Sequence, residues 1–412
     1  MYYYRFNGCK FFSMDKYEEL EEIKENTFFN SIDETIYFLN KNNPMHSRRA
    51  FSVNDVSQLF SKDESVSILY KNDVTGYAIN PIIEKLIAAR KIKSINTNYP
   101  TWKDELKKLP NKWKINVMAL GDVGSTLLIG LVLLGKDIEI GIYDRNEEKL
   151  MRWEKELKQI RIPFNVDCFP KINILNEDEL FECDMFVFCA SKGIPKVGEQ
   201  LSDYRMVQFE ENSKIISQYA KIARDHRFKG IFAVISDPVE LLCKVAFLES
   251  NKNDSGIYDF NGLASNQIIG YGLGVMNARA VYYAEKDPAF VHYKNEGRVF
   301  GPHGSGLVVA DSIINYDEVK SEQLTKKCVN ANVEVRELGF KPYVAPSLSS
   351  GALSILATIN GDFFYGSTLM RDAFFGSKMR LTNSGIEIEQ NNLDEKLRQR
   401  IETSYDELRR II

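Results

Sequence analysis

The chain has 412 residues, 44% of them hydrophobic and 27% charged, and its formal net charge is −4. This length suits two or three domains, and the composition is ordinary for a soluble globular protein. The slight negative charge argues against nucleic acid and anionic membranes as partners. No apolar run approaches the roughly 20 residues that span a bilayer, which argues against a membrane protein.

The six cysteines are scattered along the chain and include no C-x-x-C pair. Several lie in apolar segments, where buried free thiols are common. This usage favours a reducing compartment and argues against a disulfide framework or a structural zinc site. The opening segment MYYYR differs from a signal peptide, so we expect a cytoplasmic protein without a bound metal.

Residues 1–110 predict a small α+β module. The Asn-Gly pair at 7–8 predicts a hairpin turn. The acidic segment 15–25 predicts a helix, residues 66–70 predict a strand, and the Asn-Pro pair at 80–81 predicts the start of an amphipathic helix. No cluster in this part of the sequence points to a chemistry, so the role of the module stays open.

The segment 116–126, NVMALGDVGST, carries the most specific signal. A short apolar strand ends at Gly121, Gly124 follows, and an apolar helix leads to a second strand that ends at Asp144. This is the layout of a dinucleotide-binding βαβ unit, in which glycines let the backbone approach a pyrophosphate and the acid binds ribose hydroxyls. The glycine motif is imperfect, because Ala119 holds its first position.

Strand and helix candidates alternate after Asp144, which predicts a parallel sheet with right-handed crossovers. We therefore expect an α/β fold: a Rossmann-type doubly wound parallel sheet at 114–258, followed by an α+β catalytic domain at 259–412. The strand candidates are 172–175, 184–191, 230–236, 335–340 and 387–390, and the helix candidates are 147–158, 213–226, 241–248 and 393–410.

From about Lys114 to the end, five motifs follow one another: GDVGST, SKGIPKVGEQ, SDPVELL, NAR and GPHGSG. As an ordered set they resemble the lactate/malate dehydrogenase family. GDVGST resembles the family's glycine turn, and SKGIPKVGEQ, followed by Arg205 and Asn212, resembles its mobile active-site loop and the helix after it. SDPVELL resembles a segment that usually reads S/T-N-P-V-D. NAR, ending at Arg279, and GPHGSG, around His303, resemble two further active-site motifs. These are the segments 121–126, 191–200, 236–242, 277–279 and 301–306.

The resemblance implies an NAD-dependent oxidoreductase that moves a hydride between nicotinamide and a small 2-hydroxy or 2-oxo acid. His303 would give or take the proton on the substrate oxygen. Arg279 would bind the substrate carboxylate with its planar fork, and Arg205 would close over the substrate and polarise its carbonyl. It also implies a homo-oligomer, dimeric or tetrameric, with a small-molecule carboxylate as its ligand.

The same resemblance implies which residues bind the cofactor. Asp144 would select NAD over NADP, because a 2′-phosphate would face a carboxylate. The other residues belong to the glycine turn, to the ends of two strands and to the helix after the loop. They are Gly121, Asp122, Val123, Gly124, Ala190, Ser191, Asn212 and Ser236.

The sequence departs from the family at two positions. The aspartate that pairs with the histidine is replaced by Met276, and Asp237 stands where the family has asparagine. We predict that Asp237 takes over as the charge partner of His303. Alternatively, Asp237 binds a cationic substrate group such as an amine or imine, which would indicate an altered chemistry. A third reading is a catalytically weak or inert NAD-binding protein whose N-terminal module serves as a regulatory or interaction domain.

Overall fold

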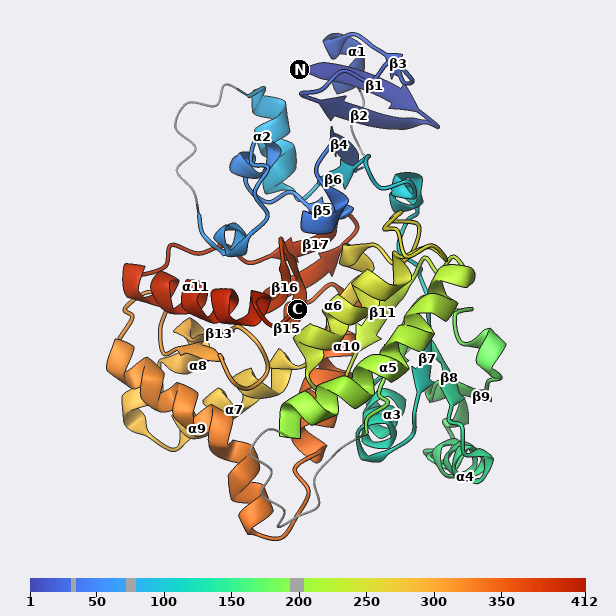
Figure 1. Cartoon of the computed structure of the whole chain (residues 1–412), viewed down its shortest axis with the longest axis vertical. Helices are drawn as coiled ribbons and strands as arrows, with labels where there is room; N and C mark the ends of the chain where they lie inside the picture. Colours follow the sequence, from blue (N-terminus) through green and yellow to red (C-terminus); the bar gives the residue numbers. More distant parts are fainter. Residues whose placement is uncertain (31–34, 72–78, 136, 193–203) are drawn as a thin grey trace.

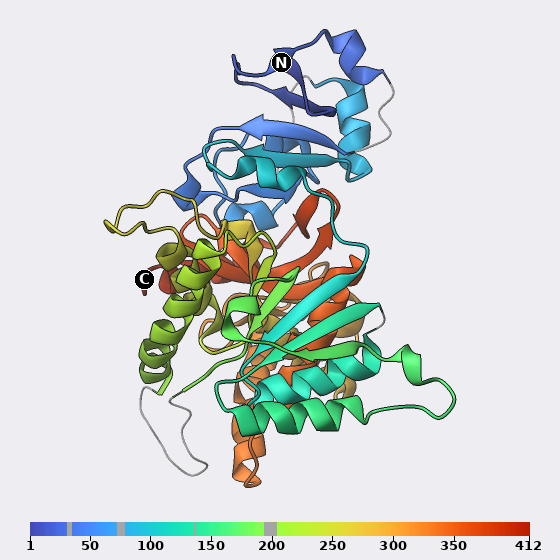
Figure 2. The same cartoon turned by 90° about the vertical axis from the view of Figure 1, so that its right-hand side faces the viewer.

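A computed structural model describes residues 1–30, 35–71, 79–135, 137–192 and 204–412, the side chains of Val166, Tyr204 and Arg205 aside. The N-terminal module (residues 1–110) packs on one side of a larger main body (residues 113–412), as Figures 1 and 2 show. Each part has its own sheet: a six-stranded sheet in the module and a nine-stranded sheet in the body.

The sheet of the module has the strand order β3-β1-β2-β4-β6-β5. The hairpin prediction is confirmed: β1 and β2 pair antiparallel, and both Asn7 and Gly8 have positive φ. The helix at the Asn-Pro pair is also confirmed, because Asn80 accepts a hydrogen bond from the Ile82 N–H at the start of α2. The elements are β1 (Tyr2–Phe6), β2 (Cys9–Ser13), β3 (Glu21–Glu22), α1 (Glu25–Phe29), β4 (Ile36–Asn40), β5 (Ala50–Ser52), α2 (Pro81–Ala88) and β6 (Ile92–Asn96), with 3-10 helices at Pro44–His46, Val56–Leu59, Val66–Leu69 and Trp102–Leu106.

Two predictions for the module are wrong. The acidic segment 15–25 contains turns and the short β3, because Glu21 and Glu22 pair with β1 instead of forming a helix. Residues 66–69 form a 3-10 helix instead of a strand, because the Ser65 hydroxyl accepts the Ser67 N–H and starts a helical turn. In both places a tertiary or capping contact overrides the local propensity.

The nine-stranded sheet confirms the Rossmann-type α/β fold. Its order is β17-β16-β15-β12-β11-β10-β7-β8-β9, and the six strands from β12 to β9 are parallel. The remaining three are antiparallel and join the parallel part through β12 and β15, so one sheet crosses residue 258. The strands are β7 (Trp113–Met118), β8 (Ile138–Tyr143), β9 (Lys171–Ile174), β10 (Met185–Phe188), β11 (Ile231–Val234), β12 (Ile268–Gly270), β15 (Phe364–Met370), β16 (Ala373–Thr382) and β17 (Gly385–Ile388).

Helices cover both faces of this sheet (Figure 1). The alternation along β10 explains why: Met185 and Val187 belong to one buried cluster, and Phe186 and Phe188 belong to another on the opposite face. The helices are α3 (Asp122–Leu134), α4 (Glu147–Lys158), α5 (Tyr204–Asp225), α6 (Val239–Ser250), α7 (Leu273–Glu285), α8 (Tyr293–Glu296), α9 (Glu318–Glu337), a π-helical segment at Pro346–Ala352, α10 (Leu353–Asn360) and α11 (Glu395–Arg409), and a two-stranded ribbon joins β13 (Arg298–Phe300) to β14 (Val308–Ala310).

The strand predicted at 335–340 is wrong, because α9 runs through Glu337. Leu324 and Cys328 are buried at helical spacing, and α9 packs on α7 and β14. The helix ends where Gly339 adopts a positive φ, a conformation that favours glycine after a helix. Packing of one helical face therefore decides the structure of a segment whose local pattern alternates.

The module joins the body along the edge strand β17, beside which β5 lies. Arg90 pairs with Glu387 at 2.8 Å, and Asn54 Nδ2 donates to the Ile388 carbonyl at 2.7 Å. A second attachment lies near β12, where Tyr99 is fully buried and its hydroxyl is 3.2 Å from Ser265 Oγ. The module is thus held at two separate edges of the body.

Candidate active site

The glycine turn between β7 and α3 has the geometry that its sequence predicts. Ala119, in the first glycine position, has φ +73°. A Cβ on Gly124 would lie 2.1 Å from the Ala119 carbonyl oxygen, so only glycine lets α3 approach the end of β7 this closely. A Cβ on Gly121 would meet nothing within 4 Å, which leaves open space over the turn.

Asp144 lies at the end of β8 and holds this turn in place. Its carboxylate accepts hydrogen bonds from the Leu120 N–H at 2.8 Å and from the Asn146 N–H at 3.0 Å, and Lys149 Nζ is 3.1 Å away. Burial alone would raise the pKa of the Asp144 carboxyl, but these hydrogen bonds and the lysine lower it overall. The group is therefore a carboxylate at neutral pH.

The carboxyl ends of β10 and β11 are linked by one side chain from α5. Asn212 is fully buried; its Nδ2 donates to the Asp237 carbonyl at 2.7 Å, and its Oδ1 accepts from the Lys192 N–H at 2.8 Å. Ser236 Oγ donates to the Ala190 carbonyl at 2.6 Å. These contacts place the predicted residues at the edge of the sheet where α/β proteins bind ligands.

Gln208 also belongs to this group, although the sequence analysis missed it. Its side chain is buried and donates to Ser191 Oγ at 3.1 Å. Gln208 precedes Asn212 by four residues on α5, so helical spacing could have identified it.

His303 lies in a glycine-rich loop that follows β13. Gly301, Gly304 and Gly306 all have positive φ, so the loop needs glycine at each position. The His303 side chain is 10% exposed, and its Nδ1 is 3.4 Å from Asp237 Oδ1. The structure therefore brings together the two residues that the sequence analysis paired.

Glu240 lies beneath this pair, in the first turn of α6. It is buried. Its Oε1 accepts a hydrogen bond from Ser367 Oγ at 2.7 Å, and its Oε2 accepts one from the backbone N–H of His303 at 3.2 Å. Burial raises the pKa of the Glu240 carboxyl to about 7, which outweighs the lowering effect of these hydrogen bonds. The sequence analysis missed Glu240, although a lone acid that opens an apolar helix is a usable signal.

Arg279 lies on α7 with its guanidinium buried. Nη1 donates to the Cys328 carbonyl at 3.2 Å, and Nη2 donates to Asn332 Oδ1. Burial lowers the pKa of Arg279, and no carboxylate of the described residues forms an ion pair with it. Asp237 lies close enough to oppose that lowering electrostatically. A buried cation with only neutral partners is suited to bind an anionic ligand.

Most of the loop that was predicted to close over the substrate lies outside the described residues. Residues 193–203 are not among those that the structure describes, and neither is the Arg205 side chain. The backbone is described again from Tyr204, where α5 begins.

The geometry can be compared with known proteins. The sequence model of the lactate/malate dehydrogenase NAD-binding domain matches residues 113–258, which include the glycine turn, Asp144 and the ends of β10 and β11. This part of the chain is therefore similar to the NAD-binding domain of lactate/malate dehydrogenases.

Individual relatives agree with this assignment. The L-lactate dehydrogenase of Clostridium botulinum is 25% identical over 264 residues, which are 62% of this chain and 74% of the relative. The L-lactate dehydrogenase of Treponema denticola is 26% identical over 202 residues, 49% of this chain and 58% of the relative. The comparisons thus indicate an NAD-dependent oxidoreductase similar to lactate dehydrogenases.

Solved structures show the same fold. A lactate dehydrogenase from a deep-sea metagenome library of the Medee basin matches with a TM-score of 0.58 and 21% identity, over 73% of this chain and 97% of its own. The minor L-lactate dehydrogenase of Enterococcus mundtii matches with a TM-score of 0.59 and 19% identity, over 73% of this chain and 98% of its own. These two dehydrogenases are covered almost completely, and about a quarter of this chain lies outside each match.

NAD is the cofactor of this family domain, and the residues present fit it. Gly121 leaves the space over the turn open, and Gly124 lets the turn pack closely. Asp144 supplies a carboxylate at the end of the second strand. The α3 N-terminus, which begins at Asp122 and Val123, faces this turn with backbone N–H groups suited to a pyrophosphate.

The family's paired aspartate is absent from its usual place on α7. Met276 is buried there, and its Sδ accepts from Arg279 Nη1 at 3.4 Å. The adjacent Asn277 accepts a hydrogen bond from the Tyr293 hydroxyl at 3.0 Å and so serves another contact. Of the described acids, Asp237 is the one that forms an ion pair with the His303 ring, whereas Glu240 contacts the His303 backbone.

None of the described helices is both long enough and apolar enough to cross a bilayer. No group of three or more His, Cys, Asp or Glu side chains in the described ranges is arranged to hold a metal ion. The oligomeric state and the cytoplasmic location stay predictions.

Proposed function

We propose that the chain interconverts a small 2-hydroxy acid and the matching 2-oxo acid, with NAD as the hydride carrier. The observation that supports this most directly is the 3.4 Å approach of His303 Nδ1 to Asp237 Oδ1 at the carboxyl ends of β10 and β11. In this proposal His303 would be the proton-transfer group and Asp237 its orienting carboxylate, beside the NAD-binding domain.

In this proposal His303 moves the substrate proton through Nε2, the ring nitrogen opposite Asp237. Asp237 Oδ1 lies 3.4 Å from Nδ1, so its charge would favour the tautomer that is protonated at Nδ1 and would stabilise the imidazolium. Asp237 therefore does the work that an aspartate at position 276 does in the family. Arg205 would polarise the substrate carbonyl when the loop closes.

Arg279 binds the substrate carboxylate in the same proposal. Its guanidinium is buried among neutral acceptors, so a bound carboxylate would supply the missing counter-charge. NAD supplies or accepts the hydride when it is bound, and Asp144 favours NADH over NADPH. Asn212 and Gln208 keep the ends of the strands in place beneath the substrate.

The decisive experiment is a panel of 2-oxo acids with NADH or NADPH, in which loss of the cofactor's absorbance reports turnover. We expect reduction of at least one 2-oxo acid, and His303→Asn should lower kcat by about 100-fold or more. His226→Asn, which changes an exposed histidine at the end of α5, is the matched control. If NADH binds but no substrate turns over, the chain is an inert NAD-binding protein; turnover only of amine-containing substrates would favour the imine chemistry.

Two substitutions, Asp237→Asn and Met276→Asp, test whether Asp237 is the charge partner of His303. Asp237→Asn restores the family residue and should still remove about tenfold or more of kcat/KM, because His303 loses its charge partner. If Asp237 does not serve this role, Asp237→Asn should be neutral and Met276→Asp should raise activity. The pH–rate profiles of the two variants decide between these outcomes.

Arg279 is tested by Arg279→Lys. An ammonium cannot reproduce the bidentate geometry, so KM for the 2-oxo acid should rise at least about tenfold while NADH affinity stays constant. Unchanged substrate kinetics would mean that the carboxylate is bound elsewhere.

A further inference from the structure

A cleft of about 680 Å³ lies at the second attachment of the module, between residues 100–104 and the end of α5. We name it the junction cleft. One wall comes from the module, and the other from residues 223–229 and 261–267 of the body. Its volume is in the range of sites that bind small molecules. The module supplies five of the lining residues: Arg49, Pro100, Thr101, Lys103 and Asp104.

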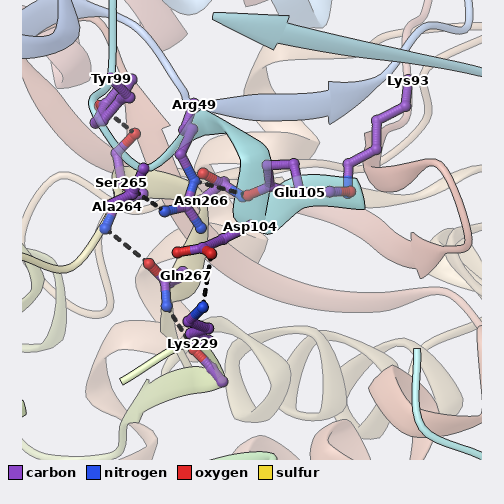
Figure 3. Close-up of polar contacts among 12 residues, drawn as sticks. Arg49, Lys93, Tyr99, Asp104, Glu105, Lys229, Ala264, Ser265, Asn266 and Gln267 are labelled. Carbon is purple, nitrogen blue, oxygen red and sulfur yellow. Dashed lines mark hydrogen bonds and ion pairs between the residues drawn. The ribbon is translucent and has the colours of Figure 1, made fainter. Parts of the chain in front are cut away.

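The module wall is built around a buried guanidinium (Figure 3). Arg49 is 4% exposed; its Nε donates to Glu105 Oε1 at 2.9 Å and its Nη1 to Thr101 Oγ1 at 2.8 Å. Glu105 is already held by Lys93 at 2.5 Å and by Asn266 at 2.9 Å. Arg49 Nη2 makes no hydrogen bond to another residue in the described ranges, and Arg49 lines the cleft.

The body wall adds positive charge. Arg224 forms a bidentate pair with Asp259, and Lys229 bridges to Asp104 at 2.7 Å across the junction. Arg227 also lines the cleft, and no carboxylate of the described chain pairs with it. Each of the first two cations therefore has a counter-charge, whereas Arg227 faces the cleft without one.

Lys103 is a second cation without a carboxylate partner among the described residues. Its Nζ lies 5.0 Å from the centroid of the Phe6 ring and 5.7 Å from that of Trp102. In all, five cationic and two acidic side chains line the cleft, on a chain whose formal net charge is −4. Phe228 and Pro100 give the same cleft an apolar surface.

We propose that the junction cleft binds a small organic anion that carries two or more carboxylate or phosphate groups. Arg227, Lys103 and Arg49 would supply the charge-assisted hydrogen bonds, and Phe228 and Pro100 would contact the carbon skeleton. A ligand that touches both walls binds only while the module is docked, so it stabilises the folded chain by linkage. This proposal does not depend on turnover at His303.

The test uses the full chain saturated with NADH, so that the glycine turn cannot take the added anion. Citrate and inorganic pyrophosphate are titrated separately by calorimetry, at ionic strength held constant with sodium chloride. We expect at least one of them to bind and to raise Tm. Tighter binding of citrate would identify a carboxylate ligand, and tighter binding of pyrophosphate would identify a phosphate ligand.

Two double variants locate the binding site. Arg227→Gln with Lys103→Gln removes the two cations that lack a carboxylate partner, and should weaken binding at least about tenfold. Arg152→Gln with Lys155→Gln removes the same charge from the exposed face of α4 and should leave binding unchanged. All four residues are exposed, so both variants should fold and bind NADH. Equal loss in the two double variants, or no binding of either anion to the parent chain, overturns the proposal.

Discussion

Glu105 at the junction and Glu240 at the active site are both buried glutamates, yet their pKa values move in opposite directions. Two cations and an amide surround Glu105, and they lower its pKa although burial opposes this. A hydroxyl and a backbone N–H surround Glu240, and burial raises its pKa to about 7. The difference teaches that burial raises the pKa of an acid unless cationic partners outweigh it.

The difference between these two pKa values corresponds to a difference in role between the junction and the candidate active site. At the junction, Glu105 is paired with both Arg49 and Lys93, and the cluster fastens the module to the body through Asn266 (Figure 3). At the active site, Glu240 titrates near neutral pH and lies one hydrogen bond from the His303 backbone. Groups with perturbed pKa values of this kind concentrate at functional sites.

The largest effect should come from breaking the junction cluster. Glu105→Gln leaves Arg49 and Lys93 buried without their carboxylate, so the free energy of unfolding at pH 7 should fall by about 3–5 kcal/mol. Because the pKa of Glu105 is lowered in the folded chain, its stabilisation exists above the unfolded pKa and is lost as the pH falls. Denaturant titration measures both effects.

The control for this variant is Glu156→Gln on α4, an exposed glutamate paired with Arg152. Exposed ion pairs contribute about 0–1 kcal/mol, so unfolding should hardly change. A loss below about 1 kcal/mol for Glu105→Gln would contradict the interpretation of the junction as a fastening.

The stabilisation contributed by Glu240 should depend on pH in the opposite sense to that of Glu105, and Glu240→Gln measures it. The pKa of Glu240 is raised in the folded chain, so the wild type should lose stability relative to the variant as the pH rises from the unfolded value toward and past 7. A shift from about 4.5 to about 7 corresponds to about 3 kcal/mol between pH 4 and pH 9. Denaturation of both proteins at several pH values measures the slope, and a stability difference that is constant with pH would refute the raised pKa.

The sequence predicted the frame of the active site because its signals are local. The glycine turn, Asp144 and the pairing of His303 with Asp237 each rest on short motifs whose order along the chain is informative. Glu240 escaped prediction because its role depends on Ser367, which lies 127 residues away on β15. A local pattern could have marked Glu240 as a lone acid at the start of an apolar helix, but it could not have revealed the Ser367 contact.

The module was harder to predict for the same reason. Its hairpin and the start of α2 follow from turn and capping residues at 7–8 and 80–81. The short β3 exists only because β1 lies beside it. In the body, residues 335–337 are helical only because α9 packs on α7. The Glu105 cluster joins residues 49, 93 and 266, so its existence depends on the tertiary fold.

Asp144 extends the comparison of Glu105 with Glu240, because it is a carboxylate of the candidate active site that stays charged at neutral pH. NADH should bind about tenfold or more tightly than NADPH, since loss of the ribose hydrogen bonds plus charge repulsion exceeds roughly 1.4 kcal/mol. Asp144→Ser should narrow this gap, because it removes the carboxylate and frees Lys149 to meet a 2′-phosphate. Calorimetry of both cofactors checks this, and equal affinities in the parent chain would refute the role of Asp144.

The smallest effect concerns the backbone of the glycine turn. Ala119 adopts φ +73°, a conformation that costs an L-residue roughly 1–2 kcal/mol, while glycine would lose about 0.4–1 kcal/mol more entropy on folding. Ala119→Gly should therefore raise the free energy of unfolding by about 0.5 kcal/mol, and the turn should keep its shape because Gly124 still packs against residue 119. Ala88→Gly is the control, because Ala88 has an ordinary helical φ at the end of α2 and glycine there should destabilise. A gain at position 119 would mean that the active site gives up stability in its backbone as well as at Glu240, whereas a loss would mean that the Ala119 methyl group contributes packing that outweighs the strain.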